Sequence, residues 1–207
     1  MIRIFFGALF SYLVGAIPTA FIFAKIMKNV DIRDYGSGNV GATNTLRVLG
    51  RLPAAFVLFL DVFKGIIAVV LFGRLFMPFF NQPPAVSLEF VRALFGICVV
   101  LGHVFNIFLK FKGGKGVATS MGVLIAIAPK AALFGLLVFV AVVIFTRYVS
   151  LGSIIAGILI PFYNHFTKQN YCAVILSAIL CIIVVATHRS NIKRLIAGRE
   201  RRVFEKK

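Results

Sequence analysis

The segment FKGGKG at residues 111–116 joins two lysines to three glycines between two long apolar stretches. Glycine exposes its backbone N–H and accepts a positive φ, so neighbouring glycines can wrap an anion, and lysine adds positive charge. One interpretation is a site for a phosphate-sized anion at a membrane surface. The other is a basic turn that only follows the positive-inside bias of membrane proteins. A Walker P-loop is excluded, because Leu109 replaces its first glycine and Gly116 replaces its Ser or Thr.

Two further polar segments have a similar character. The first, GSGNVGATNTLR at residues 36–47, places three glycines among hydroxyl and amide side chains and ends on Arg47. This mixture suits an oxygen-rich anionic ligand, and Arg47 can hold a phosphate through two N–H groups. The second, HRSNIKRLIAGRE at residues 188–200, directly follows the last apolar stretch. Three such segments in one chain favour phosphate binding over a simple basic turn.

The composition indicates the elements that must position these segments. Apolar residues make up 60% of the 207 residues and charged residues only 14%, whereas soluble domains carry about 25% charged residues. We therefore expect an all-α, polytopic integral membrane helical bundle, forming one domain over residues 1–207, with about seven transmembrane helices. Their approximate ranges are 3–27, 53–76, 87–109, 117–128, 130–146, 151–166 and 171–187. A turn containing Pro78, Pro83 and Pro84 is expected after the second.

The basic residues are distributed unevenly between the predicted loops. Seventeen of the 23 Lys and Arg residues fall in alternate loops and the C-terminal tail, against four on the opposite side and two within spans. The positive-inside rule then places the N-terminus outside and the C-terminus in the cytoplasm, which requires an odd number of spans. All three polar segments fall on the cytoplasmic face. The net charge of +17 fits membrane lipid headgroups or phosphorylated substrates, and no nucleic-acid partner is expected because so little of the chain is polar.

The strings GSGNVGATNTLR, GHVFNIFLKFKGGKGVAT and HRSNIKRLIAGRE resemble, in order, the three signatures of the bacterial acyl-phosphate:glycerol-3-phosphate acyltransferases. The resemblance covers nearly the whole chain and includes LDVFKG at residues 60–65 and SLGS at residues 150–153. Two positions depart from the family pattern. Asn106 stands where a proline is usual, which bears on the bend ahead of the FKGGKG segment, and Ala16 stands where a serine is common.

The resemblance implies a reaction and its setting. A fatty acyl group would pass from acyl phosphate to the sn-1 hydroxyl of glycerol 3-phosphate, giving 1-acylglycerol 3-phosphate (lysophosphatidic acid) and phosphate, the first step of phospholipid synthesis. The family uses no acyl carrier protein or CoA, no cofactor and no metal. The protein would be a multi-pass monomer of the bacterial cytoplasmic (inner) membrane with its active site on the cytoplasmic side. Acyltransferases with a soluble catalytic domain use a histidine followed five residues later by an aspartate that orients the imidazole. None of the three histidines of this chain has an aspartate at that position.

The resemblance also implies roles for individual residues. The expected catalytic residues are Ser37, Arg47, His188 and Asn191. The expected glycerol 3-phosphate site, acting through backbone N–H and ammonium groups, consists of Lys112, Gly113, Gly114, Lys115 and Gly116. Further substrate contacts are expected from Asn39, Gly41, Thr43, Asn44 and Ser153. Glu200 is expected to be structural, pairing with a basic residue of the tail.

The reaction does not require covalent catalysis by the protein. Acyl phosphate is an activated mixed anhydride, so positioning and charge neutralisation can supply most of the rate. Ser37 has no visible Asp–His relay in the sequence, so we expect direct attack by the substrate hydroxyl in a ternary complex. The proton would pass to His188 or to a substrate phosphate, and the sequence does not decide between them.

Several polar groups lie within the predicted spans. Asp61 and Lys64 are three residues apart, hence on one helix face, and need partners in a membrane. They either face the active site or pair to lock helices together. His103 is either a packing residue or part of the site. The three cysteines have no metal-ligand spacing and are expected to act as small apolar residues, Cys98, Cys172 and Cys181.

Two other classes of function stay open on the sequence alone. A transporter or flippase for a phosphorylated metabolite would use the same residue types, although such proteins place the site near the membrane midplane and often show internal repeats. A non-catalytic assembly factor would not need three phosphate-suited segments on one side. The acyltransferase is the favoured interpretation.

Overall fold

The computed structural model describes residues 1–76 and 87–203, and the regular secondary structure in these ranges is helical. The expected turn with Pro78, Pro83 and Pro84 lies outside the described residues. The chain forms two compact units, Met1–Ile127 and Ala128–Lys207, and each is described by itself.

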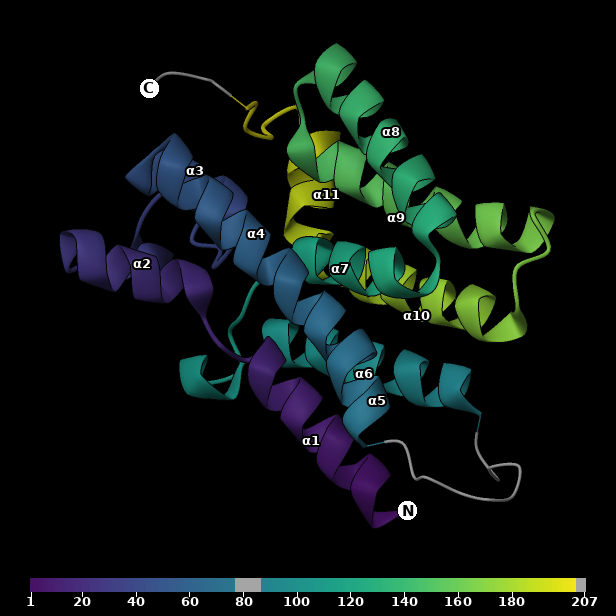
Figure 1. Ribbon diagram of the computed structural model, residues 1–207. Coiled ribbons are helices and arrows are strands. Elements are labelled where there is room, and N and C mark those ends of the chain that lie inside the picture. Colours follow the sequence, from purple (N-terminus) through teal and green to yellow (C-terminus); the bar gives the residue numbers. More distant parts are fainter. Residues whose placement is uncertain (77–86, 204–207) are drawn as a thin grey trace. The chain divides into compact units, whose positions relative to one another are not determined.

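The first unit contains both glycine-rich segments. Its elements, coloured purple to teal in Figure 1, are α1 (Ile2–Gly15), α2 (Thr19–Lys28), the 3-10 turn η1 (Ile32–Asp34), α3 (Ala42–Leu49), α4 (Arg51–Ile67), the π-helical turn η2 (Ala68–Phe72), α5 (Gly73–Leu75), α6 (Leu88–Val104), the 3-10 turn η3 (Ile107–Leu109) and α7 (Val117–Ile127). Helices α4, η2 and α5 form one continuous helical segment (Figure 1). The FKGGKG segment therefore connects the end of α6 and η3 to the start of α7.

The second unit contains four helices. They are α8 (Pro129–Thr146), α9 (Val149–Phe166), α10 (Tyr171–Thr187) and α11 (Arg189–Ile196). Helix α9 packs against both α8 and α10. The buried Asn164 of α9 donates a hydrogen bond to the hydroxyl of Ser177 on α10 at 3.1 Å. His188 lies at the junction of α10 and α11, where the chain bends by 60°.

Five helical segments of the described residues are long and apolar enough to cross a membrane. They are Ile2–Lys28, Arg51–Leu75, Leu88–Leu109, Pro129–Thr146 and Val149–Phe166. A sixth is added if α10 and α11 are counted as one bent span. Helix α7 is apolar but has 11 residues, about 16 Å of helix, which is about half of the hydrocarbon thickness. The helical fold is confirmed for the residues that the structure describes, whereas the count of seven spans stays a prediction.

Glycines allow two helix pairs of the first unit to approach closely. A Cβ on Gly15 of α1 would meet the carbonyl of Val99 on α6, and one on Gly102 of α6 would meet the carbonyl of Tyr12 on α1. In the same way, a Cβ on Gly122 of α7 would meet the carbonyl of Val62 on α4. Small residues at helix contacts are typical of membrane proteins. Through these contacts α1 and α4 support the two helices, α6 and α7, that hold the FKGGKG segment.

The first span is interrupted between α1 and α2. Pro18 has no backbone N–H to continue the helix, and the break exposes the carbonyls of the two residues before it. Asn106 donates its side-chain amide to the carbonyl of Ala16 at 2.6 Å. The ammonium of Lys64 lies 3.4 Å from the carbonyl of Ile17. The Ile17 carbonyl also accepts the backbone N–H of Thr19 at 3.0 Å. Polar side chains from other helices thus add hydrogen bonds at the break, which suits a membrane interior.

Candidate functional site

The GSGNVGATNTLR segment folds around one buried side chain, Asn44 on α3. Its Oδ1 accepts a hydrogen bond from the backbone N–H of Ser37 at 2.8 Å, and its Nδ2 donates to the carbonyls of Ile32 and Tyr35 at 3.1 and 3.0 Å. Asn44 is completely buried. The amide of Asn44 therefore shapes the loop from inside, which is a different role from the substrate contact that the sequence predicts.

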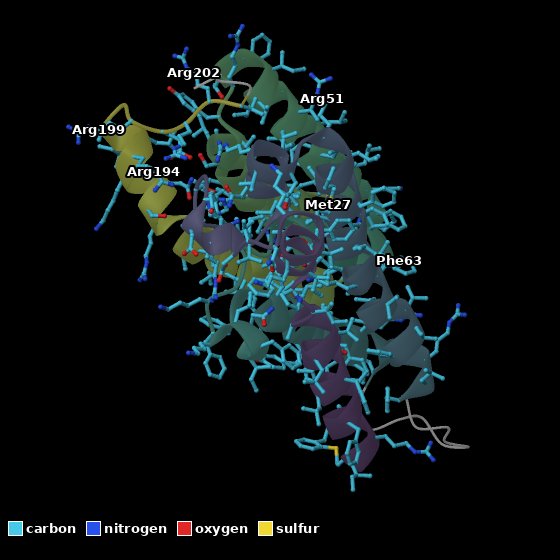
Figure 2. The ribbon with its side chains drawn as sticks, turned by 90° about the vertical axis from the view of Figure 1, so that its left-hand side faces the viewer. Met27, Arg51, Phe63, Arg194, Arg199 and Arg202 are labelled. Carbon is cyan, nitrogen blue, oxygen red and sulfur yellow. The ribbon has the colours of Figure 1, made fainter. Side chains whose placement is uncertain are left out.

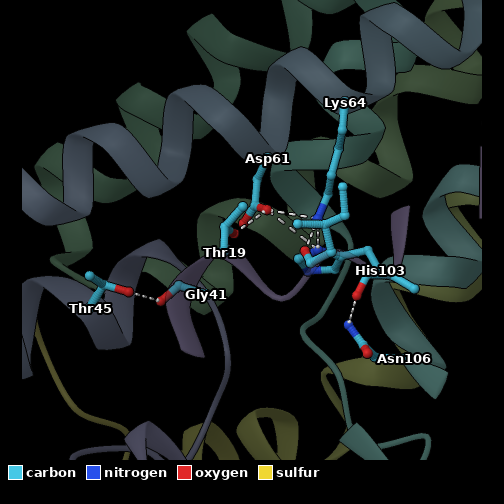
Figure 3. Close-up of polar contacts among 9 residues, drawn as sticks. Thr19, Gly41, Thr45, Asp61, Lys64, His103 and Asn106 are labelled. Carbon is cyan, nitrogen blue, oxygen red and sulfur yellow. Dashed lines mark hydrogen bonds and ion pairs between the residues drawn. The ribbon is translucent and has the colours of Figure 1, made fainter. Parts of the chain in front are cut away.

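The same loop leaves other predicted residues accessible. Gly36 and Gly38 have φ of +62° and +71°, a conformation that favours glycine, and they turn the chain on either side of Ser37. The side chains of Ser37 and Arg47 are exposed, while Asn39 and Thr43 are half-buried. Gly41 precedes α3, and its carbonyl accepts a hydrogen bond from the Thr45 hydroxyl at 3.1 Å (Figure 3).

An ion pair fixes the entry to this loop. Asp31 accepts a hydrogen bond from the backbone N–H of Arg33 at 2.9 Å, and its carboxylate lies 2.6 Å from the Arg33 guanidinium. The hydrogen bond from the guanidinium is the main reason that the pKa of Asp31 is lowered. The guanidinium also lies over the ring of Phe21, 5.6 Å from its centroid. The residues before the GSGNVGATNTLR segment are thereby attached to α2.

The FKGGKG segment folds back onto the end of α6. Asn106 begins η3, where its Oδ1 accepts from the N–H of Leu109 at 3.2 Å. The N–H groups of Gly113 and Gly114 then donate to the carbonyls of Val104 and His103 at 3.0 and 3.1 Å. A Cβ at Gly113 would meet these two carbonyls, so the close approach needs glycine. The segment is a turn built on α6 rather than a free loop.

This geometry corrects one detail of the sequence interpretation. The N–H groups of Gly113 and Gly114 were expected to face an anion, but both donate to α6 carbonyls. Gly116, with φ of +81°, stands just ahead of α7, and its carbonyl accepts from the N–H of Ser120 at 2.8 Å. Lys112 is exposed and Lys115 is half-buried. The two lysines are thus the accessible cationic groups of the turn, and the glycine pair sets its path.

A buried polar cluster lies beside this turn (Figure 3). The Lys64 ammonium lies 2.8 Å from Asp61 Oδ1 and 2.9 Å from His103 Nδ1. Thr19 donates its hydroxyl to the same Asp61 oxygen at 2.8 Å. Each of these four side chains belongs to a residue that is at most 8% exposed. The pairing of Asp61 with Lys64, one of the two alternatives left open by the sequence, is present.

The cluster also shows what sequence reasoning missed. His103 is 39 residues from Lys64 and Thr19 is 42 residues from Asp61, and no spacing pattern links positions so far apart. The sequence offered one signal. An unpaired charge in a membrane span is energetically costly, which predicts that Asp61 and Lys64 have partners but does not identify them. Among the residues that the structure describes, no group of three or more His, Cys, Asp or Glu side chains could hold a metal ion.

In the second unit, His188 and Asn191 are held by different partners. His188 Nδ1 lies 2.7 Å from the carbonyl of Val184, so Nδ1 is the donor. In the neutral ring, Nε2 then carries the lone pair and can act as a base. Asn191 donates its amide to Glu200 Oε1 at 2.5 Å. Both residues, which were predicted from the HRSNIKRLIAGRE segment, are buried. Ser153 is buried too, and its hydroxyl donates to the carbonyl of Val149 at 2.9 Å.

Glu200 connects three parts of the second unit. Its Oε1 also accepts from the Ser150 hydroxyl at 2.7 Å, and its Oε2 accepts from Arg194 Nε at 2.7 Å. Burial raises the pKa of Glu200, but the hydrogen bonds from Ser150, Arg194 and Asn191 together outweigh it and leave the pKa lowered. The expected pairing of Glu200 with a basic residue is confirmed, and that residue is Arg194. In Figure 2 Arg194 lies on α11, and Arg199 and Arg202 follow it.

Outside these clusters much of the surface is apolar. Phe59 and Phe63 of α4 stack with ring centroids 5.6 Å apart and are 61% and 44% exposed. Phe63 is labelled in Figure 2. Exposed aromatic pairs on a span are expected where helices face lipid or acyl chains. The polar contacts described above lie at helix ends and in the interior of each unit, whereas these phenylalanines are exposed.

The comparisons with known proteins agree with this arrangement. A family model described as glycerol-3-phosphate acyltransferase matches residues 5–198. A glycerol-3-phosphate acyltransferase of Thermoanaerobacter sp. (strain X514) is 46% identical over 199 residues, covering 96% of this chain and 95% of that protein. Crystal structures of PlsY (YgiH), an integral membrane glycerol 3-phosphate acyltransferase, are 38% identical and cover 96% of this chain and 94% of theirs. The TM-score is 0.86 for the glycerol 3-phosphate form and 0.84 for the lysophosphatidic acid form.

These matches extend over nearly the whole chain, in sequence and in structure, and the family model spans the first two motifs and residues 188–198 of the third. The resemblance drawn from the motifs is thereby confirmed. The chain belongs to the PlsY-type glycerol-3-phosphate acyltransferase family of integral membrane proteins.

Proposed function

We propose that the protein transfers a fatty acyl group from acyl phosphate to the sn-1 hydroxyl of glycerol 3-phosphate. The products are 1-acylglycerol 3-phosphate and inorganic phosphate. The observation that carries this proposal is the FKGGKG turn, which presents Lys112 and Lys115 beside a backbone held on α6. Two cations on a rigid turn suit a phosphate group, and a PlsY structure in a glycerol 3-phosphate form is 38% identical to this chain.

The proposed chemistry uses an activated donor and no covalent enzyme intermediate. The sn-1 oxygen of glycerol 3-phosphate attacks the carbonyl carbon of acyl phosphate, the new ester bond forms, and the bond between that carbon and the phosphate oxygen breaks. Arg47, Lys112 and Lys115 offset the negative charge of the two phosphates, which lets the reactants approach each other. Ser37, Asn39, Gly41, Thr43 and Ser153 complete the substrate contacts expected from the motifs.

The proton of the attacking hydroxyl goes to His188 Nε2 or to a phosphate oxygen. The hydrogen bond from His188 Nδ1 to the Val184 carbonyl supports the first route, because it leaves Nε2 unprotonated in the neutral ring. Asn191 is held in one orientation by Glu200, as expected of a group that must meet a substrate in fixed geometry.

The proposal includes the setting of the reaction. The protein acts as a monomer and as one domain in the bacterial inner membrane, with about seven spans, the N-terminus outside, and the C-terminus and active site on the cytoplasmic side. The uneven distribution of Lys and Arg along the chain supports this orientation. No cofactor, metal, acyl carrier protein or CoA takes part.

The test uses the full chain purified in detergent, with palmitoyl phosphate and glycerol 3-phosphate as substrates. Inorganic phosphate and lysophosphatidic acid are followed together, and a parallel sample receives palmitoyl-CoA instead. We expect equimolar products from palmitoyl phosphate and none from palmitoyl-CoA. Product from palmitoyl-CoA would contradict the proposed donor. Folded protein inactive with both donors would favour a transporter, to be tested by uptake of glycerol 3-phosphate into proteoliposomes.

A further inference from the structure

The buried cluster of Asp61, Lys64 and His103 contacts the FKGGKG turn through His103. The carbonyl of His103 accepts the N–H of Gly114 at 3.1 Å. A Cβ on Gly114 would collide with His103 Nε2, so the imidazole edge lies directly against the Gly114 Cα. Both the backbone and the ring of His103 therefore support the glycine pair.

The partners of Lys64 fix how the imidazole ring is oriented. An ammonium group has three protons to donate and no acceptor, and Lys64 has three acceptors around it: Asp61 Oδ1, His103 Nδ1 and the carbonyl of Ile17. His103 Nδ1 must then be the acceptor, which places the ring proton on Nε2, the edge that faces Gly114. Asp61 is held in turn by the Thr19 hydroxyl at 2.8 Å.

The position of Gly114 also matters to the other glycine-rich segment. A Cβ on Gly114 would meet the carbonyl of Val40, which belongs to the GSGNVGATNTLR loop. The His103 ring and the Val40 carbonyl thus both lie against the position that a Gly114 side chain would occupy. A shift of the His103 ring would move the turn relative to Val40, and with it the two lysines that flank the glycine pair.

A simple ion pair within α4 would not need His103 as a third member. Asp61 and Lys64 are on the same helix and already lie 2.8 Å apart, so their charges are compensated without His103. His103 instead comes from α6, the helix that carries the turn, and its ring contacts both Lys64 and Gly114. The cluster therefore connects α4 to the turn, in addition to stabilising α4.

We propose that His103 is a positioning residue for glycerol 3-phosphate: oriented by Lys64 and Asp61, its ring sets the path of Gly113 and Gly114, so that Lys112 and Lys115 are presented to one phosphate group. This inference rests on the proposed function, because it takes that substrate as the ligand of the turn. His103 does not contact the reacting atoms in this role, since its Nε2 edge is covered by Gly114.

The test measures glycerol 3-phosphate binding by calorimetry on the full chain in detergent, together with the KM for each substrate. The variants are His103→Leu, which removes both ring nitrogens, and His103→Asn, whose Oδ1 can still accept from Lys64. We expect His103→Leu to raise the Kd and KM for glycerol 3-phosphate at least tenfold and to leave the KM for palmitoyl phosphate within twofold. His103→Asn recovers part of the loss. The matched control is His165→Leu, at an exposed histidine, which leaves both constants unchanged.

The binding measurement separates this inference from the proposed reaction. A parent protein that binds glycerol 3-phosphate without transferring an acyl group would contradict the reaction, while the Kd values of the variants still decide the role of His103. Parent-like Kd and KM values in folded His103→Leu would overturn the inference. If that variant does not fold, His103→Asn decides, because equal changes in both KM values there indicate a merely structural role.

Discussion

The side-chain oxygen of Asn44 accepts a hydrogen bond from the backbone N–H of Ser37, seven positions earlier in the chain, at 2.8 Å. Because Asn44 is completely buried, this bond fixes the backbone of an exposed serine from inside the protein. The conformation of the first motif thus depends on a residue that has no surface of its own to offer a substrate.

Replacing Asn44 with alanine is expected to lower both stability and activity. The variant leaves the N–H of Ser37 without this acceptor, and an unsatisfied buried group costs about 1–3 kcal/mol. The carbonyls of Ile32 and Tyr35 each lose one donor, although backbone N–H groups still donate to both. We expect a lower Tm in detergent and at least a tenfold loss of acyl transfer. Asn170→Ala is the control, because it removes one helix-capping bond, to Ala173, away from the motifs. Parent-like activity in Asn44→Ala would show that the loop holds its shape without this amide.

Removing single positive charges from the motifs is expected to affect activity and not insertion. Arg47→Ala and Lys115→Ala each remove a cation proposed to meet phosphate, and a hydrogen bond to a charged group contributes about 1.5–3 kcal/mol, or roughly 10- to 150-fold in rate. Steady-state kinetics of membranes with equal amounts of protein measure the loss. Lys130→Ala, at an exposed lysine outside the three motifs, should retain parental kinetics. Full activity in both motif variants would remove these residues from the site.

His188→Ala distinguishes the two routes for the proton. If His188 Nε2 accepts it, kcat falls by about 10²–10⁴-fold while both KM values change little. If a phosphate oxygen accepts it, the fall in kcat stays below tenfold. Because the ring also donates to the Val184 carbonyl, the Tm of the variant is measured in parallel. A large fall in kcat at an unchanged Tm supports the histidine, and a small fall at an unchanged Tm supports the substrate phosphate.

Glu200 is expected to make stability depend on pH in the acid range. Its pKa is lowered from the ordinary value of 4.5, with burial opposing the hydrogen bonds of Ser150, Arg194 and Asn191. A lowered pKa in the folded state means that the carboxylate stabilises the protein above pH 4.5, and that this stabilisation is lost as the pH falls through the lowered value. We expect the Tm difference between the parent and Glu200→Gln to be constant from pH 7 down to about 5.5 and to shrink below 4.5. A difference independent of pH would mean that the charge itself contributes nothing.

The helical membrane fold could be predicted because it depends on a property that single residues carry. Long apolar stretches identify spans without any knowledge of their neighbours, and the structure places helices on each of them. Shorter amphipathic elements were missed. The segment between the first two predicted spans contains α3, and the segment after the last predicted span contains α11. Both helices have eight residues, and in both the polar residues outweigh the apolar pattern that marks a span.

The sequence could predict which residues belong to the candidate site, but it could predict few of the contacts that these residues make. The three motifs indicated which residues to consider, but the buried role of Asn44 and the hydrogen bonds of Gly113 and Gly114 depend on tertiary contacts. Asn106 illustrates the limit. Its place in a position usually held by proline suggested a changed bend, whereas the structure shows it capping η3 and donating to the carbonyl of Ala16. A single sequence does not contain the distance between residues that are 90 positions apart.

The interruption of the first span at Pro18 limits which amino-acid substitutions the protein can accept. An amide and an ammonium group inside a bilayer need acceptors as much as a bare carbonyl needs a donor, and the carbonyls of Ala16 and Ile17 serve Asn106 and Lys64 because the helix is broken there. A regular helix through this position, as Pro18→Ala would favour, would occupy the Ala16 carbonyl with a backbone N–H and leave the Asn106 amide without this acceptor. Lys64 would keep Asp61 and His103. We therefore expect Pro18 and Asn106 to tolerate replacement together better than either tolerates it alone.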